Sequence, residues 1–513
     1  MEYFILASKI IVTVLYAVTL MLLCIFGLHR YYLSYLYKKY KHKKPVPGSR
    51  YKNLPVVTIQ LPIYNEMYVV ERLISSVCKI DYPRDLLEIQ VLDDSTDKTV
   101  EIASRCVNQF KESGIDIVYI HRENREGYKA GALREGLKKA KGELLAVFDA
   151  DFIPPREFLR NTVDFFSDPG IGMVQVRWGH VNLDYSTLTK AQAILLDGHF
   201  MIEQTARYNG GMFFNFNGTA GVLRKECIES SGGWQHDTLT EDLDLSYRAQ
   251  LAGWKLVYLR DMVADAELPV DMNAFKSQQH RWAKGGVQTA IKILPEVFRR
   301  KDLSFRIKSE AFFHLFGNIS YLLLLVLFLL MFPMGFFWSE IGWDSGILVN
   351  VFAITAGTLS FVLFYIITVR EVHGKNWLAY LKYVPLAISI GAGMAVNNSK
   401  AVLEALLGKN SEFRRTPKFA VTSRNDNWRS RSYVASKEAT AIIEIAFGVM
   451  FFLQTLLAIY MGYLGWVPFL LLIQFGFLYT GLLSIFHGTG KKGAAAHINP
   501  IIPEPALQRE KDF

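Results

Sequence analysis

Two closely spaced carboxylates have the residue types and spacing of a metal–diphosphate site. Residues 149–151 read Asp-Ala-Asp, and such a pair on a loop offers two hard oxygen ligands that suit Mg²⁺ or Mn²⁺ bridging a diphosphate. The cation would neutralise the charge that develops on a departing nucleoside diphosphate. Lys129, in the Gly-Tyr-Lys-Ala-Gly motif of residues 127–131, would add a compact positive charge beside the phosphates. Asp149 and Asp151 are therefore candidate metal ligands, although one Asp-x-Asp pair is common by chance.

Two later motifs supply a candidate base and a candidate sugar platform. Residues 240–242 read Thr-Glu-Asp, and a carboxylate there could take a proton from a hydroxyl that lies about 2.6–3.2 Å away. Residues 278–282 read Gln-Gln-His-Arg-Trp. Arg281 can pair with phosphate oxygens through its fork, and Trp282 offers a flat apolar face for the C–H surface of a sugar ring. An equally good local interpretation is an amphipathic helix with Arg281 and Trp282 as membrane-interface anchors.

The elements that must position these motifs alternate between strands and helices. The pattern predicts strands at residues 56–61, 87–92, 115–120 and 144–148, and helices at residues 67–79, 96–113 and 131–140. This alternation is typical of a mostly parallel sheet covered by helices.

Three polar motifs follow the first, second and fourth of these strands: residues 62–66 (Pro-Ile-Tyr-Asn-Glu), residues 93–95 (Asp-Asp-Ser) and residues 149–151. Ligands of such sheets bind beyond the carboxyl ends of the strands. Each motif alone could be an ordinary turn or helix cap, but three at the same edge predict a binding site.

Composition and charge indicate a membrane protein with one soluble domain. Of the 513 residues, 51% are apolar and only 20% are charged, which is unusual for a soluble enzyme of this length. The formal net charge of +9 collects beside the apolar runs, so it favours a membrane surface, and no nucleic-acid-binding motif competes for it. The four cysteines show no CxxC spacing, so free thiols are expected rather than a disulfide framework or a zinc site.

Apolar runs predict five membrane spans, with six as the alternative. Residues 10–28 are expected to form a signal anchor, and the lysines that follow at residues 38–44 place the next domain in the cytoplasm. Further spans are predicted at residues 315–337 and 346–369, and two more within residues 445–486. Residues 384–396 are apolar but short, so an interfacial or re-entrant segment is the preferred interpretation.

The predicted organisation has four parts. It comprises a transmembrane anchor (1–45), a cytoplasmic domain with interfacial helices (46–310), a transmembrane region (311–490) that contains an interfacial or gating segment (378–438), and a cytoplasmic tail (491–513). Such a chain is expected in an inner or plasma membrane as a multi-pass protein.

Taken in order, these motifs resemble the processive branch of the inverting family 2 glycosyltransferases, which includes cellulose, chitin, hyaluronan and mannan synthases. The shared pattern is Asp, Asp-x-Asp, Thr-Glu-Asp and Gln-(Gln/Arg)-x-Arg-Trp. Residues 216–221 (Phe-Asn-Gly-Thr-Ala-Gly) and 232–234 (Gly-Gly-Trp) are similar to the cellulose-synthase-like mannan and glucan synthases, and the likeness covers residues 54–290. Residues 413–418 (Phe-Arg-Arg-Thr-Pro-Lys) resemble the Phe-x-Val-Thr-x-Lys gating loop of cellulose synthases, with Arg415 in the place of valine.

The resemblance implies a GT-A nucleotide-diphospho-sugar transferase fold and a set of site residues. Asp242 would be the catalytic base of a single displacement that converts an α-linked donor to a β-linkage, and Asp149 and Asp151 would hold Mg²⁺ or Mn²⁺. The nucleotide-sugar would be bound by Tyr64, Glu66, Asp93, Asp94, Lys129, Asp149, Asp151 and Arg281. The acceptor would be bound by Thr240, Glu241, Gln278, Trp282, Asn217 and Gly218.

The predicted function is therefore membrane-bound, inverting synthesis of a β-linked polysaccharide from UDP-glucose or GDP-mannose. The expected partners are the nucleotide-sugar donor, the polysaccharide acceptor and the lipid membrane, without nucleic acid. The Gln-Gln-His-Arg-Trp motif and the gating-loop resemblance favour a processive enzyme over a non-processive transferase that makes a glycolipid. A non-catalytic transporter or scaffold is a third possibility, which the intact Asp-x-Asp and Thr-Glu-Asp motifs disfavour.

Overall fold

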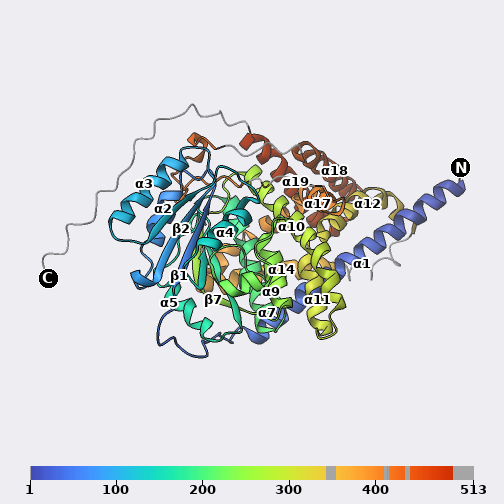
Figure 1. The fold of residues 1–513 in the computed structure, drawn as a ribbon. Coiled ribbons are helices and arrows are strands. Elements are labelled where there is room, and N and C mark those ends of the chain that lie inside the picture. Colours follow the sequence, from blue (N-terminus) through green and yellow to red (C-terminus); the bar gives the residue numbers. More distant parts are fainter. Residues whose placement is uncertain (1, 342–353, 410–412, 414, 434–439, 489–513) are drawn as a thin grey trace.

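A seven-stranded mixed sheet lies at the centre of the soluble part of the chain in the computed structural model (Figure 1). The structure describes residues 2–341, 354–409, 413, 415–433 and 440–488. The strand order is β3-β2-β1-β4-β6-β5-β7, in which β6 runs antiparallel to both of its neighbours and the other pairings are parallel. The strands are β1 (Val57–Ile63), β2 (Leu87–Asp93), β3 (Ile117–His121), β4 (Leu144–Val147), β5 (Ile171–His180), β6 (Gly221–Arg224) and β7 (Lys255–Ala266).

The pairing of β1 with β2 brings two of the polar motifs together. Both strands are buried along almost their whole length, as expected for parallel strands covered on both faces, although apolar and polar residues alternate in them (Val-Thr-Ile-Gln-Leu and Leu-Glu-Ile-Gln-Val). Their register pairs Val57 with Leu87 and Ile63 with Asp93, so both strands end at the same level. Residues 64–66 and 94–95 therefore leave the sheet side by side.

Helices cover both faces of the sheet and form two apolar cores. One core lies under α2 (Val70–Val77), α3 (Thr99–Glu112) and α5 (Phe158–Thr162). The other lies under α4 (Tyr128–Lys139), α8 (Lys225–Ser230) and α9 (Glu241–Leu251). These two layers fix the strand ends relative to the first turns of α4 and α9, where Lys129 and Asp242 lie.

Two further helical units connect the sheet to the apolar helices. One is continuous from α6 (Thr187–Asp197) through a π-helical turn (Gly198–Gln204) into α7 (Thr205–Asn209). The other is α10 (Met272–Arg299), a 28-residue helix that packs against α9 and against α17 (Ala395–Leu406). The residues predicted at 278–282 therefore lie within a helix that contacts both parts of the protein.

Three helices within the described residues are long and apolar enough to cross a membrane: Tyr3–Tyr40, Thr440–Tyr460 and Leu464–Gly488. A fourth crossing results if Phe305–Phe316 and Ile319–Gly335, which meet at a 62° bend, act as one span. The predicted pair of helices within residues 445–486 is confirmed as α18 (Thr440–Tyr460) and α19 (Val467–Gly488). The predicted span at 346–369 begins outside the described residues, which resume at residue 354.

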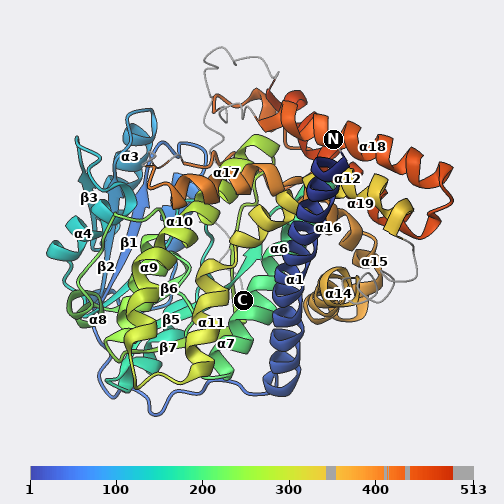
Figure 2. The same cartoon turned by 90° about the vertical axis from the view of Figure 1, so that its right-hand side faces the viewer.

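The short apolar run predicted to be interfacial forms α16 (Val384–Gly393). Ten helical residues extend about 15 Å, half of a bilayer's hydrocarbon core, and α16 packs against α19 and α6. Figure 2 shows α1 (Glu2–Tyr40) beginning beside α12 (Ile319–Ile341) and continuing along the flank of the sheet domain. One helix thus spans both the apolar bundle and the side of the soluble domain.

Candidate active site

A pocket at the carboxyl edge of β1, β2 and β4 brings together fourteen of the fifteen residues predicted for the site. Its volume is about 180 Å³, and its walls come from the ends of these strands, from α4, α9 and α10, and from Phe413, Arg415, Thr416 and Lys418. The predicted residues that line it are Tyr64, Glu66, Asp94, Lys129, Asp149, Asp151, Asn217, Gly218, Thr240, Glu241, Asp242, Gln278, Arg281 and Trp282.

Asp93 is the predicted site residue that does not line the pocket. It is the last residue of β2 and is fully buried, and its carboxylate accepts hydrogen bonds from the Tyr119 hydroxyl and from the Ser95 amide at 2.9 Å. Successive strand side chains point to opposite faces, so Asp94 rather than Asp93 faces the pocket. Asp93 therefore stabilises the turn at residues 94–95 through its hydrogen bond to the Ser95 amide.

The end of the pocket beside Tyr64 is rich in arginine. Arg122 donates to both carboxylate oxygens of Asp94. The guanidinium of Arg125 stacks on the Tyr64 ring at 3.4 Å from its centroid and lies 4.9 Å from that of Tyr128. Neither arginine belongs to a motif predicted from the sequence, although both lie within five residues before the glycine-flanked motif of Lys129.

Lys129 connects the Asp-x-Asp loop to the loop at Gly218. Its ammonium donates to a carboxylate oxygen of Asp149 and, at 2.9 Å, to the Gly218 carbonyl. Although burial lowers the pKa of Lys129, the carboxylates of Asp149 and Glu241 raise it above the ordinary value. The lysine is therefore a fixed positive charge in the middle of the pocket.

Asp151 lies deeper than Asp149 and has a cationic partner of its own. Its Oδ2 accepts from the Lys418 ammonium at 2.7 Å and from the Glu267 amide at 3.2 Å. No cluster of three His, Cys, Asp or Glu side chains within the described part of the chain could hold a metal ion. Asp149 and Asp151 thus form a two-carboxylate set that a bound ligand would have to complete.

Asp242 lies in the first turn of α9, opposite Gly218. A Cβ atom at Gly218 would lie 2.9 Å from Asp242 Oδ2, and the φ of +78° at this position also favours glycine. Burial, reinforced by the neighbouring Glu241 charge and opposed by Lys129, raises the pKa of Asp242 from 3.8 to about 7. A carboxyl group with this pKa can accept a proton at neutral pH.

Helix α10 approaches α9 closely because it has a glycine at the contact. A Cβ atom at Gly285 would lie 2.6 Å from the methyl group of Thr240, which immediately precedes α9. This contact places Gln278, Arg281 and Trp282, one to two turns earlier, in the pocket wall. The Arg281 guanidinium lies 4.5 Å from the centroid of the Phe413 ring. Arg281 and Trp282 therefore face the pocket rather than only a lipid surface.

Residues 415–418 are held over the pocket by two ion pairs. Arg415, which replaces the valine of the gating-loop pattern, donates to Glu66 at 2.8 Å, and Lys418 pairs with Asp151. Burial raises the pKa of Glu66 to about 7, although Arg415 opposes the rise. Glu267, which follows β7, accepts from the Phe419 amide at 2.9 Å. Glu267 was missed by the motif analysis, but its position directly after a strand at this edge is a signal that could have identified it.

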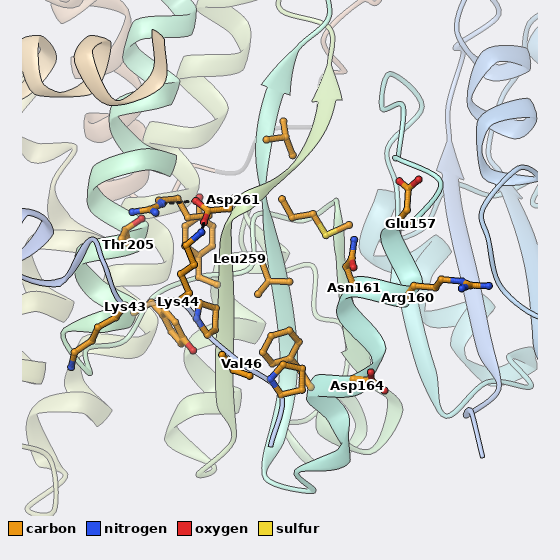
Figure 3. A pocket seen from close by; sticks show the side chains of 18 of the residues that line it. Lys43, Lys44, Val46, Glu157, Arg160, Asn161, Asp164, Thr205, Leu259 and Asp261 are labelled. Carbon is orange, nitrogen blue, oxygen red and sulfur yellow. Dashed lines mark hydrogen bonds and ion pairs between the residues drawn. The ribbon is translucent and has the colours of Figure 1, made fainter. Parts of the chain in front are cut away.

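A larger cleft of about 730 Å³ lies elsewhere, between residues 43–50 and the middle of β7 (Figure 3). None of the fifteen predicted site residues lines it. Its carboxylate at Asp261 is already paired with Lys44 at 2.7 Å and with Arg260 at 3.0 Å. The larger volume of this cleft therefore does not make it the candidate active site. The predicted carboxylates and cationic side chains lie together in the smaller pocket.

Comparison with known proteins agrees with this geometry. Residues 55–285 match the family described as "Glycosyltransferase like family 2". Glucomannan 4-beta-mannosyltransferase 2 of Arabidopsis thaliana is 44% identical over 278 residues, which are 52% of this chain and 52% of the relative. Glucomannan 4-beta-mannosyltransferase 1 of Oryza sativa subsp. japonica is 40% identical over 319 residues, which are 58% of this chain and 61% of the relative. The match thus spans about half to three-fifths of these relatives.

A solved structure has the same fold. The mannosyltransferase PcManGT from Pyrobaculum calidifontis, in complex with GDP-Man and Mn²⁺, aligns with a TM-score of 0.54 at 19% sequence identity. The alignment covers 77% of this chain and 100% of that structure. It confirms the predicted GT-A arrangement of the sheet.

Proposed function

We propose that this chain transfers a hexose from a nucleotide-sugar to the end of a β-linked glycan, with inversion at the anomeric carbon. The match of residues 55–285 to the glycosyltransferase family 2 supports the proposal. One observation carries the proposal: Asp242, with a pKa of about 7, lies in one pocket with Lys129, Asp149, Arg281 and Trp282. The groups needed to hold a diphosphate, accept a proton and stack a sugar are thus close together.

GDP-mannose is the donor that we propose first, and UDP-glucose is the second. The relatives named as glucomannan 4-beta-mannosyltransferases support a mannosyl donor, as does the neighbouring fold that was solved with GDP-Man. Tyr64, Asp94 and Arg125 would hold the nucleoside at the arginine-rich end of the pocket. Lys129 and Arg281 would hold the diphosphate by charge-assisted hydrogen bonds.

The two carboxylates of the Asp-x-Asp motif fit a divalent cation. Asp149 is partly exposed to the pocket and Asp151 lies beside it, and each carboxylate has a lysine partner on one oxygen only. Hard oxygen ligands with open coordination positions suit Mg²⁺ or Mn²⁺, which usually complete their shell with substrate phosphates and water. When bound, the cation would act as a Lewis acid on the diphosphate.

Asp242 would act as the general base. The acceptor hydroxyl would donate its proton to the Asp242 carboxylate as its oxygen bonds to the anomeric carbon, and the carbon–oxygen bond to the diphosphate would break on the opposite side. Lys129, between Asp149 and Gly218, would stabilise the leaving charge. Trp282 would hold the terminal acceptor sugar in line by stacking, and Gln278 and Asn217 would bind its hydroxyl groups.

The apolar helices support a membrane location for this reaction. We place the soluble domain at residues 46–310, on the cytoplasmic side, between the anchor at residues 1–45 and the apolar region from residue 311. Helix α10 carries Gln278, Arg281 and Trp282 in the pocket wall and also packs against α17, so the pocket adjoins the apolar helices. This proximity is consistent with the processive enzyme that we propose.

The test is to incubate membranes that contain the full chain with labelled GDP-mannose, UDP-glucose or both. The product is then digested with linkage-specific hydrolases. We expect a polymer that β-mannanase degrades, with glucose incorporated only when both donors are present. A labelled glycolipid without polymer would instead establish the non-processive alternative. Release of free sugar alone, or no turnover of either donor, would contradict the proposal.

A further inference from the structure

Both ends of the Asn217 carboxamide are held by residues of the π-helical turn Gly198–Gln204. Gln204 Nε2 donates to Asn217 Oδ1 at 2.8 Å, and Asn217 Nδ2 lies 3.1 Å from His199 Nε2. The backbone of Asn217 is fixed separately, because its amide donates to Gln175 Oε1 at 2.8 Å. The side chain that faces the sugar-binding part of the pocket is thus clamped from two sides.

The donor and acceptor of each of these hydrogen bonds can be assigned from one contact, which is that between Gln204 and the Asn215 carbonyl. Gln204 Nε2 also donates to the Asn215 carbonyl at 2.8 Å, and a carbonyl can only accept. Gln204 therefore presents its NH₂ group to Asn217, and Asn217 must present its oxygen. The Asn217 NH₂ group then faces His199, so His199 Nε2 is the acceptor and its proton is on Nδ1.

Glu203 independently supports this tautomer of His199. Its carboxylate lies 3.2 Å from His199 Nδ1 and 3.3 Å from Arg207, and it is paired with Arg30 of α1 as well. Although burial raises the pKa of Glu203, Arg207 and its other partners hold it well below the ordinary value. An ionised carboxylate can only accept a hydrogen bond, so the His199 Nδ1 must donate.

The π-helical hydrogen-bonding pattern explains how His199 and Gln204, which are five residues apart, can both contact the Asn217 side chain. In an α-helix, residues five apart are separated by about 140° around the axis. In a π-helix the i→i+5 hydrogen bond brings them to the same side, and such turns are frequent at functional sites. His199 and Gln204 are five apart, and the turn Gly198–Gln204 lies between two α-helical segments. An α-helical path through these residues would direct one of the two side chains away from Asn217.

The clamped residue adjoins the proposed base. Gly218, the next residue, accepts a hydrogen bond from Lys129 and packs against Asp242. A shift of Asn217 would therefore move the acceptor-binding wall relative to Asp242, whereas the donor end at Tyr64 and Asp94 would stay in place.

We propose that His199 and Gln204 are positioning residues that hold the Asn217 carboxamide so that its second N–H binds a hydroxyl of the acceptor sugar. This inference rests on the proposed glycosyltransferase function. It predicts that loss of the clamp misplaces the acceptor without affecting the donor, so that water competes better for the activated sugar.

The test compares the full-length wild type with His199→Leu and His199→Gln in the presence of the labelled nucleotide-sugar that the wild type uses. Polymer and free sugar are both quantified. A side-chain hydrogen bond is worth about 0.5–1.5 kcal/mol, or about 2- to 13-fold. His199→Leu should therefore lower the ratio of polymer to hydrolysed donor by about 2- to 13-fold with the donor KM unchanged. His199→Gln, which restores an acceptor oxygen, should recover most of this ratio.

Two controls separate positioning from general damage. His314→Leu replaces a half-buried histidine whose partner is the Tyr247 hydroxyl at 2.8 Å, so it should lower thermal stability without changing the ratio. In a double-mutant cycle, His199→Leu should change the ratio little once Asn217→Ala is present.

Equal losses of polymer and hydrolysis in His199→Leu, or additive effects with Asn217→Ala, would overturn the inference. If His199→Leu fails to fold, an unchanged ratio in Asn217→Ala would overturn it equally. Absence of transfer in the wild type would instead count against the proposed function.

Discussion

Replacing Asp242 by asparagine should abolish most activity and stabilise the fold at the same time. The substitution keeps the size of the side chain and removes its basicity. Because general-base catalysis contributes about 10²- to 10⁴-fold, transfer should fall by that order while donor binding changes little. In the wild type, activity should rise with pH through about 7, since burial raises the pKa of Asp242 to that value.

The same burial predicts the effect on stability. Below pH 4, Asp242 is protonated in both the folded and the unfolded chain, and its ionisation costs nothing. Between the ordinary pKa of 3.8 and the folded value of about 7, the unfolded chain releases the proton and the folded chain keeps it, so stability falls as pH rises. This interval corresponds to at most about 4 kcal/mol. We expect about 1–2 kcal/mol because Asp242 is only half-buried and solvent screens part of the cost.

Thermal unfolding in detergent at two pH values measures this effect. Intrinsic tryptophan fluorescence is suitable because the chain has nine tryptophans and because this signal, unlike a thiol-reactive dye, does not require a thiolate at pH 4.5. At pH 8 the Asp242→Asn protein should unfold a few degrees higher than the wild type, at about 2–4 °C per kcal/mol, and at pH 4.5 the difference should shrink. Asp237→Asn, which alters an exposed carboxylate near α9, should change neither activity nor stability appreciably. A pH-independent Tm difference, or near-normal turnover by Asp242→Asn, would refute the reasoning.

Three further predictions follow from the pocket and the apolar helices. Asp151→Ala should abolish transfer in a protein that still elutes as a single species, and EDTA should inhibit the wild type until Mg²⁺ or Mn²⁺ is restored; full activity in EDTA would show that the pair is structural. Trp282→Ala should reduce elongation without weakening nucleotide binding, whereas lower expression with unchanged specific activity would indicate a lipid anchor. In a background without natural cysteines, a membrane-impermeant reagent should label Gly462→Cys in intact cells and Lys111→Cys only after lysis; the reverse pattern would invert the proposed topology.

The first four strands and the edge at which the site forms could be predicted because their signals are local. β4 is a continuous apolar run, β1 and β2 are short segments with an apolar residue at every second position, and a polar motif begins at or just after the end of each. Strand β3 begins and ends within two residues of the predicted range. The helix predicted from residue 67 begins at Val70 instead, because Asn65 adopts a φ of 53° and residues 64–69 form a turn.

The other half of the sheet and the lid of the pocket depend on contacts that are distant in sequence. β6 has only four residues and lies between β4 and β5, and its antiparallel pairing has no local signature. The pairing of Arg415 with Glu66 joins residues 349 positions apart. The sequence motif does not distinguish Asp93 from Asp94. Only the direction of each side chain at the end of β2 shows that Asp93 is buried in the turn and that Asp94 lines the pocket.

The charge of the pocket gives an independent physical reason to expect a divalent cation. Seven carboxylates and five lysine or arginine side chains are among the residues that line it, so the pocket carries a net negative charge when its carboxylates ionise. The diphosphate of a nucleotide-sugar donor adds about two more negative charges, one for each phosphate. Two like charges 4 Å apart repel by about 4 kcal/mol at an effective dielectric constant of 20. A divalent cation that enters with the donor cancels the donor's charge, so the pocket binds a nearly neutral pair.

Lys129 on Asp149 and Lys418 on Asp151 already supply positive charge where the cation would bind. Binding of the cation would thus weaken the contact between Lys418 and Asp151, and it would couple donor binding to the position of residues 415–418.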